Sequence, residues 1–280
     1  MSADLEQALA AKCLTNPAFL SKAIECSRGN QVHDNYLPHP HLSHIEALST
    51  HVFDGATLER LRLFSGLITK VKHNPLREEI PKTFKLLSLL GLEISFFSFL
   101  SIPYVEMKAT HGKLERDQQL DFFACHLIRF FESNQSVTTT AVTDVLRHEL
   151  CLYRARMSRH AAIPHQQRRF GAVRRLGFFE THSYETDVVK LCSSIERHSD
   201  GLPVNYEPCI LAYSKTGQTP LVTVSKIDQL ARLVFSLVND YSTSDEIGMA
   251  LGGLGLAEIK GADLNDFFEE ATSLGFLTID

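Results

Sequence analysis

Apolar residues recur with helical spacing over the first part of the chain. In "ATLERLRLFSGLITKV", Leu58, Leu61, Leu63 and Leu67 fall near one stripe, which predicts an amphipathic helix. Further helical patterns cover 75–91, starting at Pro75, and then 117–133 and 137–157. Together with short amphipathic patterns over residues 1–30, these helices, five or six in all, predict a helical domain over residues 1–160.

The pattern changes toward the C-terminus. Three short β-rich runs cover 187–195, 208–214 and 221–225, and the loop "KTGQTP" between the last two predicts a hairpin. Three helical patterns follow, opened by the pairs Ser225/Asp228 and Ser242/Asp245 and, for the third, by Asp263. Gly275 suits the end of that third helix, and "FLTI" predicts a last strand. The predicted fold class is α+β, mainly α, with a winged-helix-like unit of three strands and three helices over 181–280.

A basic segment separates the two predicted domains. Residues 147–180 hold eight arginines against two acids, and we assign 161–180 as a basic linker. This arginine band, residues 147–180, has three interpretations: a solvated linker, a contact with nucleic acid, or a contact with a partner protein.

Charge argues against DNA as the ligand of the C-terminal unit. The whole chain carries a net charge of −5, and the predicted third helix, "ADLNDFFEEATSLG", has four acids and no Lys or Arg. Binding to duplex DNA depends on cations that neutralise phosphates, so nucleic acid is not an expected partner. A winged-helix DNA-binding regulator, with the arginine band on the phosphates, is the alternative function.

The remaining composition predicts a cytoplasmic protein. The first residues show no secretory signal, and the apolar stretch at 86–105 is interrupted by Glu93 and Pro103, which favours a buried helix pair over a membrane span. The six cysteines lie far apart without a C-x-x-C pair, as is typical of reduced thiols.

The strand after the hairpin predicts a peptide-binding edge. An extended peptide can pair with the free backbone groups of such a strand, and the third helix would line the groove beside it. The predicted peptide-binding residues are Leu221, Val222, Thr223, Val224, Ser225, Lys226, Phe267, Phe268 and Ala271. The alternative for the two phenylalanines is a place in the core.

No self-sufficient catalytic site is expected in this chain. A histidine-rich loop could bind a metal ion or could be a plain solvated loop; its residues are His33, Asp34, His39, His41, His44 and His51. The pairs Cys125/His126 and Cys151/His148 combine a nucleophile with a base, but both cysteines are expected to pack on apolar helical faces. We therefore predict no catalytic residue, no metal site and no cofactor in the chain itself.

Two stretches resemble known families. "EPCILAYSKTGQTPLVTVSKIDQLARLVFSLVNDYSTSDEI" followed by "DLNDFFEEATSLGFL" resembles the PqqD-like RiPP recognition element, which binds the leader of a ribosomally made precursor peptide. The helical half, with Ile80-Pro81-Lys82-Thr83 and "LRHE" at 146–149, resembles the TglI/MbnC-like companion subunits of multinuclear non-haem iron peptide oxidases.

These resemblances imply a partner subunit. The chain would bind the precursor leader and present its C-terminal cysteine to a TIM-barrel iron oxidase in a heterodimer, for β-carbon excision of the 3-thiaglutamate type. Iron is then expected in the partner enzyme. The arginine band becomes the expected contact with that enzyme, through Arg147, His148, Arg154 and Arg156.

Overall fold

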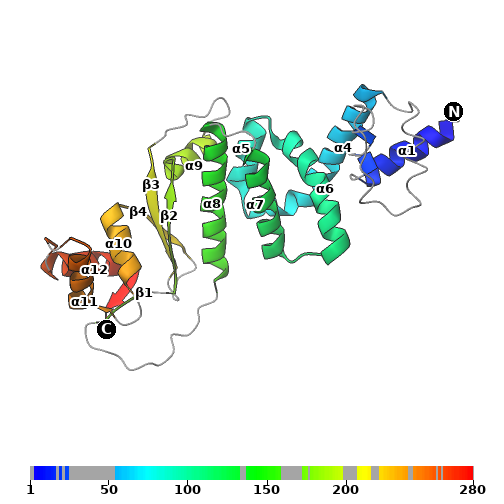
Figure 1. Ribbon diagram of the computed structural model, residues 1–280. Helices are drawn as coiled ribbons and strands as arrows, with labels where there is room; N and C mark the ends of the chain where they lie inside the picture. The colour runs from blue at the N-terminus through cyan, green and yellow to red at the C-terminus, as the bar shows by residue number, and fades with distance from the viewer. Residues whose placement is uncertain are drawn as a thin grey trace. The chain divides into compact units, whose positions relative to one another are not determined.

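The computed structural model confirms the α+β, mainly α, fold class. It describes residues 3–16, 19–20, 23–24, 54–132, 137–158, 172–175, 177–197, 207–215, 221–238, 242–256, 258–259 and 261–279 (Figure 1). The chain divides into two compact units, Met1–Gln135 and Ser136–Asp280.

The first unit is helical. Its described elements are α1 (Ala3–Thr15), α4 (Gly55–His73), the 3-10 helix η2 (Asn74–Glu78), α5 (Pro81–Leu89), α6 (Glu93–His111) and α7 (Arg116–Glu132). Asp54 caps α4 by accepting a hydrogen bond from the Thr57 backbone N–H at 2.7 Å. An aromatic cluster of Phe84, Phe96, Phe97 and Phe123 forms the core, with neighbouring ring centroids 5.2–6.2 Å apart.

The predicted apolar stripe of α4 is only partly confirmed, because Leu58 and Leu61 pack in a core cluster whereas Leu63 and Leu67 do not. Leu58 is buried, but Leu63 and Leu67 are 42% and 43% exposed, and α4 buries Ser65, Gly66 and Thr69 instead. The reason is close packing of α4 against α6. A Cβ atom on Gly66 would lie 2.4 Å from Ser98 Oγ and 2.9 Å from Ser98 N, so only glycine fits there.

The second unit is built around two small antiparallel sheets, with strand orders β2-β3-β4 and β5-β1-β6. Its elements are α8 (Val137–Met157), β1 (Ala172–Arg175), β2 (Phe178–Tyr184), α9 (Val188–Arg197), β3 (Cys209–Lys215), β4 (Thr223–Ile227), α10 (Gln229–Leu237), β5 (Ser242–Thr243), α11 (Ser244–Gly253), α12 (Gly261–Ser273) and β6 (Leu277–Ile279).

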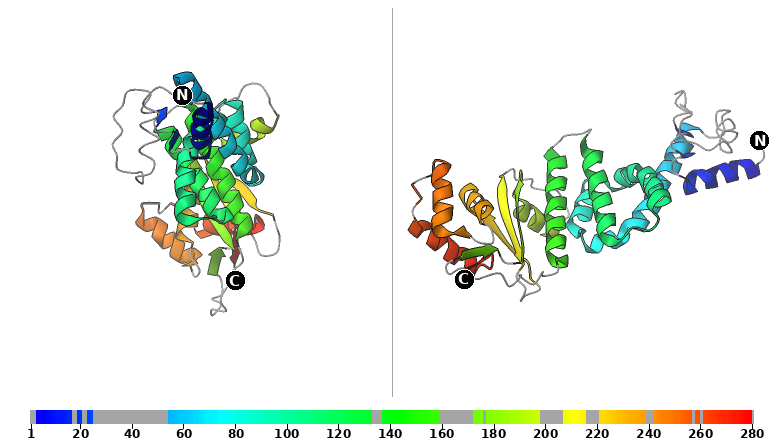
Figure 2. Two further views of the ribbon diagram at one scale, coloured as in Figure 1. Left: turned by 90° about the vertical axis from the view of Figure 1, so that its right-hand side faces the viewer. Right: turned by 60° about the horizontal axis from the view of Figure 1, so that its bottom comes forward.

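The β2-β3-β4 sheet lies between two layers of helices. Helices α8 and α9 lie on one side of it, and α10, α11 and α12 lie on the other (Figures 1 and 2). Alternate residues of each strand face opposite layers. Tyr213 of β3 bonds to His148 of α8, whereas its neighbour Ala212 joins the core with Phe235 and Phe268.

The domain boundaries differ from the prediction. Helix α8 was expected in the first domain, but the compact units divide at 135/136, so α8 belongs with the sheet. The predicted linker 161–180 also contains β1 and the start of β2. Within β1, Arg174 is buried, and the guanidinium of Arg175 donates to the Phe235 carbonyl at 2.5 Å. Residues expected to form a linker are therefore part of the folded second unit.

The remaining predicted elements are mostly confirmed. Strands β3, β4 and β6 and helices α10, α11 and α12 occur where expected, and Gly275 has the positive φ (76°) of a helix end. The run at 187–195 is helix α9, not a strand. Its buried residues Val188, Leu191, Cys192 and Ile195 follow the i, i+3, i+4, i+7 spacing of a helix. The predicted capping pairs Ser225/Asp228 and Ser242/Asp245 are not the ones observed. Asp228 itself caps α10, and Thr243 with Glu246 forms the capping box of α11.

In the part of the chain that the structure describes, no single helix is long and apolar enough to span a membrane. Helices α5 and α6 reach that length and composition only as a pair, across a bend of 119°.

Replacing Gly66 with alanine should destabilise the first unit. The added methyl group would displace Ser98 and separate α4 from α6, which we expect to lower the free energy of unfolding by about 1–3 kcal/mol, although alanine favours a helix. Gly55→Ala in the same helix is the matched control, because no atom lies within 4 Å of the added Cβ. Urea denaturation followed by circular dichroism compares the two variants. Equal stability of both would show that α4 and α6 are not in such close contact.

Candidate functional site: a groove beside an open strand edge

Strand β4 lies at one edge of the β2-β3-β4 sheet. It pairs antiparallel with β3, from Ser214↔Thr223 to Ile210↔Ile227. Among the residues described, no strand pairs with the other side of β4. An edge strand of this kind presents unpaired N–H and C=O groups to an incoming chain.

A groove runs beside β4, between that strand, α10 and α12. Its volume is about 270 Å³. Pockets for whole small ligands usually measure about 300–1,000 Å³, so this groove better suits one or two side chains of a longer molecule. The lining residues are Ser225, Lys226, Ile227 and Asp228 from β4 and its end, Ala231 and Phe235 from α10, Phe267, Glu270 and Ala271 from α12, and Leu274 and Phe276 beyond it.

The floor of the groove is apolar and buried. Phe235 and Phe276 are 2% and 1% exposed, and their ring centroids lie 5.8 Å apart. Phe267 contacts Phe235 at 5.2 Å and is only half-buried, while Leu274 is exposed at the groove's margin. The groove thus offers apolar surface that an occupant could cover.

The charged groups of the groove are mainly acidic. Asp228 and Glu270 line it, and α12 also carries Asp263, Asp266 and Glu269 without any Lys or Arg. Among the described lining residues, the one base is Lys226, which directs its ammonium group to Asp187, with Nζ 3.4 Å from Oδ2. An occupant with positive charge fits this rim best.

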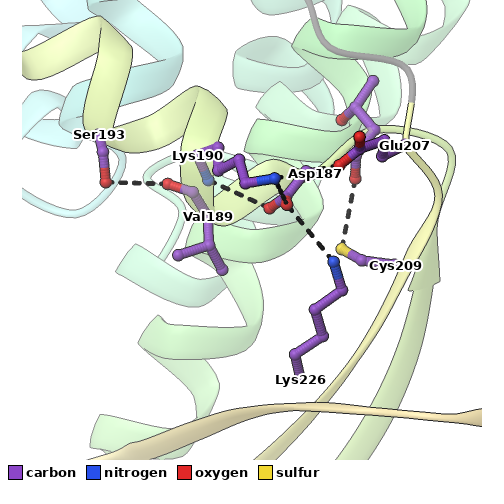
Figure 3. Close-up of polar contacts among 8 residues, drawn as sticks. Asp187, Val189, Lys190, Ser193, Glu207, Cys209 and Lys226 are labelled. Atoms are coloured by element: carbon purple, nitrogen blue, oxygen red, sulfur yellow. Dashed lines mark hydrogen bonds and ion pairs between the residues drawn. The ribbon is translucent and has the colours of Figure 1, made fainter.

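The Lys226–Asp187 ion pair fastens β4 to the start of α9 (Figure 3). Asp187 also accepts from the Lys190 backbone N–H at 3.2 Å and lies 3.2 Å from Lys190 Nζ. Lys190 in turn reaches Glu207 at 3.0 Å, next to the start of β3. Burial tends to raise the pKa of Asp187, but the hydrogen bonds from Lys190 and the charges of Lys226 and Lys190 outweigh it, so the pKa lies below its ordinary value.

The predicted peptide-binding residues are only partly gathered at the groove. Four of them line it: Ser225, Lys226, Phe267 and Ala271. Thr223 and Val224 belong to β4 outside the groove lining, whereas Leu221 and Val222 precede the strand and Leu221 is 73% exposed. Phe268 is 1% exposed within the core, as the alternative for it stated, so it offers no surface to a ligand.

Sequence reasoning missed several lining residues. Glu270 and Leu274 follow Phe267 at i+3 and i+7 on α12, so helical spacing from Phe267 pointed to both. Phe235 and Phe276 come from separate elements, and no spacing in the sequence links them to β4.

The predicted partner-binding residues lie on α8. Arg147, Arg154 and Arg156 are exposed. Arg147 and Arg154 are seven residues apart and share a face, whereas Arg156 points about 200° away from Arg154 by helical spacing. His148 is only 6% exposed, and its Nδ1 lies 2.6 Å from the Tyr213 hydroxyl, so its prediction as a surface contact is wrong.

His148 belongs to a buried polar layer between α8 and the sheet. The hydroxyls of Tyr213 and Tyr184 lie 2.7 Å apart, and Asp144 Oδ2 accepts from the backbone N–H groups of Glu185 and Thr186 and from the Thr186 hydroxyl, each at 2.9 Å. Burial raises the pKa of both tyrosines, which keeps them neutral. This layer accounts for the position of α8 in the second unit.

The cysteine pairs considered as nucleophiles are not arranged for that chemistry. Cys151 Sγ lies 3.5 Å from Glu180 Oε2, while His148 bonds to Tyr213 instead. Burial, with the charge of Glu180, raises the pKa of Cys151, and burial also raises the pKa of Cys209 and brings that of Cys13 to about 11. These thiols are protonated at neutral pH and are poor nucleophiles. Cys125 is exposed, contrary to its predicted place on an apolar face.

The histidine-rich loop from His33 to His51 lies outside the described residues. A different set of metal-ligand side chains, Cys151, Glu180 and His182, comes together at α8 and β2.

No protein-family model matches this chain, and no curated protein matches it either.

Replacing Asp187 with asparagine should reduce the dependence of stability on acid pH. Because the folded-state pKa of Asp187 lies below its ordinary value of 3.8, its contribution is present above that value and is lost as the pH falls through the folded-state pKa. Asp187→Asn should lower stability at neutral pH and flatten the loss between about pH 5 and pH 2. Urea denaturation across that range measures both effects.

Lys226→Met serves as the graded control for this prediction. It keeps the Asp187 carboxylate and its bonds to Lys190 but removes one cation, so the acid-dependent loss should shrink without vanishing. An unchanged pH profile in Asp187→Asn would contradict the assignment.

Proposed function

We propose that this chain is a non-catalytic peptide-binding subunit, and that its groove holds an extended segment of another polypeptide. The observation that supports this most directly is the open edge of β4 beside an apolar groove. Strand addition uses such an edge for backbone hydrogen bonds, while the adjoining pocket selects side chains.

The geometry of β4 matches this mode of binding. Ile227 packs toward the α10–α12 core, and Thr223 and Ser225 share its face by strand alternation. Every second side chain of an added strand would face the same layer and reach the groove walls at Phe267 and Leu274. The volume of about 270 Å³ then accommodates one or two apolar side chains of the bound segment.

The charged groups at the rim of the groove limit which peptide segments are expected to bind there. With Lys226 engaged by Asp187, the other charged groups among the described lining residues are the carboxylates of Glu270 and of Asp228, which caps α10. A segment that alternates apolar side chains and carries a nearby Lys or Arg is therefore the preferred ligand.

The family resemblances refine this proposal. The bound segment is the leader of a ribosomally made precursor peptide, and the chain presents the precursor's C-terminal cysteine to an iron-dependent oxidase for β-carbon excision of the 3-thiaglutamate type. The iron belongs to the oxidase, a TIM-barrel enzyme with which the chain forms a heterodimer in the cytoplasm. Arg147 and Arg154, which share an exposed face of α8, are the proposed contacts with it.

A charge introduced at the groove should weaken peptide binding. Leu274→Glu places a carboxylate on apolar lining beside Glu270, and we expect at least tenfold weaker binding. The probe is a labelled synthetic peptide that alternates apolar side chains and carries a nearby Lys or Arg, and fluorescence anisotropy measures its affinity. Met249→Glu on α11 is the matched control, because Met249 is 71% exposed and does not line the groove. Absence of binding to the wild-type chain, or equal affinity of both variants, would contradict the proposal.

Charge reversal on α8 should weaken the proposed heterodimer. The double variant Arg147→Glu/Arg154→Glu should dissociate from the co-expressed iron oxidase at lower salt than the wild type, while peptide binding stays unchanged. Arg197→Glu, an exposed arginine on α9, is the control. Size-exclusion chromatography at increasing salt detects the complex. If the wild type and both variants coelute with the oxidase to the same salt concentration, this face of α8 is excluded as the contact.

A further inference from the structure

Three side chains with metal-binding atoms meet on the face of the sheet that α8 covers. Cys151 comes from α8, and Glu180 and His182 come from β2. One ligand atom from each lies within 4.8 Å of the other two. His182 Nε2 is 2.9 Å from Glu180 Oε2, and Cys151 Sγ is 3.5 Å from the same oxygen.

The strand geometry explains why these residues converge. Positions 180 and 182 lie two apart on β2, so their side chains point to the same face of the sheet. Their β3 partners are Tyr213 and Leu211, both fully buried on that face. His182 is also held by its neighbours, with ring centroids 6.0 Å from Tyr213 and 6.5 Å from Tyr184.

We propose that Cys151, Glu180 and His182 bind one divalent transition-metal ion, with Zn²⁺ as the best fit. Zinc bonds to sulfur at about 2.3 Å and to nitrogen and oxygen at about 2.0–2.2 Å, so tetrahedral ligand atoms lie roughly 3.3–3.7 Å apart. The Cys151–Glu180 separation of 3.5 Å lies in that range, the His182–Glu180 separation of 2.9 Å lies below it, and the ligand atoms of Cys151 and His182 lie within 4.8 Å of each other. A thiolate combined with an imidazole favours zinc over magnesium or calcium.

Access to the site is one-sided. Cys151 is only 2% exposed and forms its floor, whereas the side chains of Glu180 and His182 are 36% and 40% exposed. An ion can therefore enter from solvent, and with three protein ligands its fourth position stays open to water or a small ligand. The thiolate is the form of cysteine that binds a metal ion, so the entering cation displaces the proton of the Cys151 thiol.

The bound ion would fasten α8 to β2. This role is independent of the peptide groove, which lies on the α10–α12 side of the same sheet. It is also independent of the iron assigned to the partner oxidase.

Cobalt titration of the full chain tests the site. Co²⁺ bound by a thiolate gives a near-ultraviolet charge-transfer band, which we expect to saturate at one equivalent and to disappear when Zn²⁺ is added. Imidazoles of the histidine-rich loop do not give this band. Cys151→Ser should abolish it, and His182→Gln should weaken Co²⁺ binding at least tenfold. Cys209→Ser is the matched control, since Cys209 is a buried thiol of the same unit and bonds to the Thr186 carbonyl at 3.3 Å instead.

The result that overturns the site is a wild-type chain without the thiolate band, or the same band in Cys151→Ser. Circular dichroism shows whether Cys151→Ser folds. If it does not, Glu180→Gln tests the metal site in its place, because this variant keeps the thiol and changes a partly exposed ligand. Unchanged Co²⁺ affinity in that variant would exclude the site. Zn²⁺ should also raise the thermal unfolding midpoint of the wild type and leave that of His182→Gln nearly unchanged.

Discussion

The packing of α8 on the β2-β3-β4 sheet is the contact on which the second unit depends. The helix brings polar side chains into a buried layer, where each needs a partner. His148 meets Tyr213, Asp144 receives three donors from residues 185 and 186, and Cys151 approaches Glu180. These bonds specify one position of α8 on the sheet, because a shifted helix would leave several buried polar atoms unpaired.

Covering both faces of the sheet determines where a ligand can bind. Helices α8 and α9 occupy one face and α10, α11 and α12 the other, so the faces are closed to a ligand, and backbone pairing, which lies in the plane of the sheet, is possible only at an edge. At β4 that edge adjoins apolar side chains that are supported from below by Phe235 and Phe276. The proposed peptide site is thus a consequence of how the helices share the sheet.

Local sequence patterns predicted most of the helices and strands, with 187–195 and the two strands between 172 and 184 as the exceptions. The hairpin, the helices behind it and the edge position of β4 all follow from alternation, helical spacing and turn residues. Long-range contacts were not visible in the same way. Gly66 gave no sign that Ser98 lies against it, and α8 carried no signal that it packs on strands formed later in the chain. The burial of Phe268 beside half-exposed Phe267 was likewise decided by packing, since adjacent helical positions differ by about 100°.

The edge of β4, with which no other described strand pairs, also affects how copies of the chain can associate when no ligand is bound. Such an edge is a template for strands of other molecules, including a second copy of itself, and proteins commonly protect it with lysine. Lys226 sits within β4 with its charge neutralised by Asp187, so stacking copies edge to edge would bring this pair toward a dry interface. A segment bound along β4 would cover this same edge, so an occupied groove would leave it closed to a second copy of the chain.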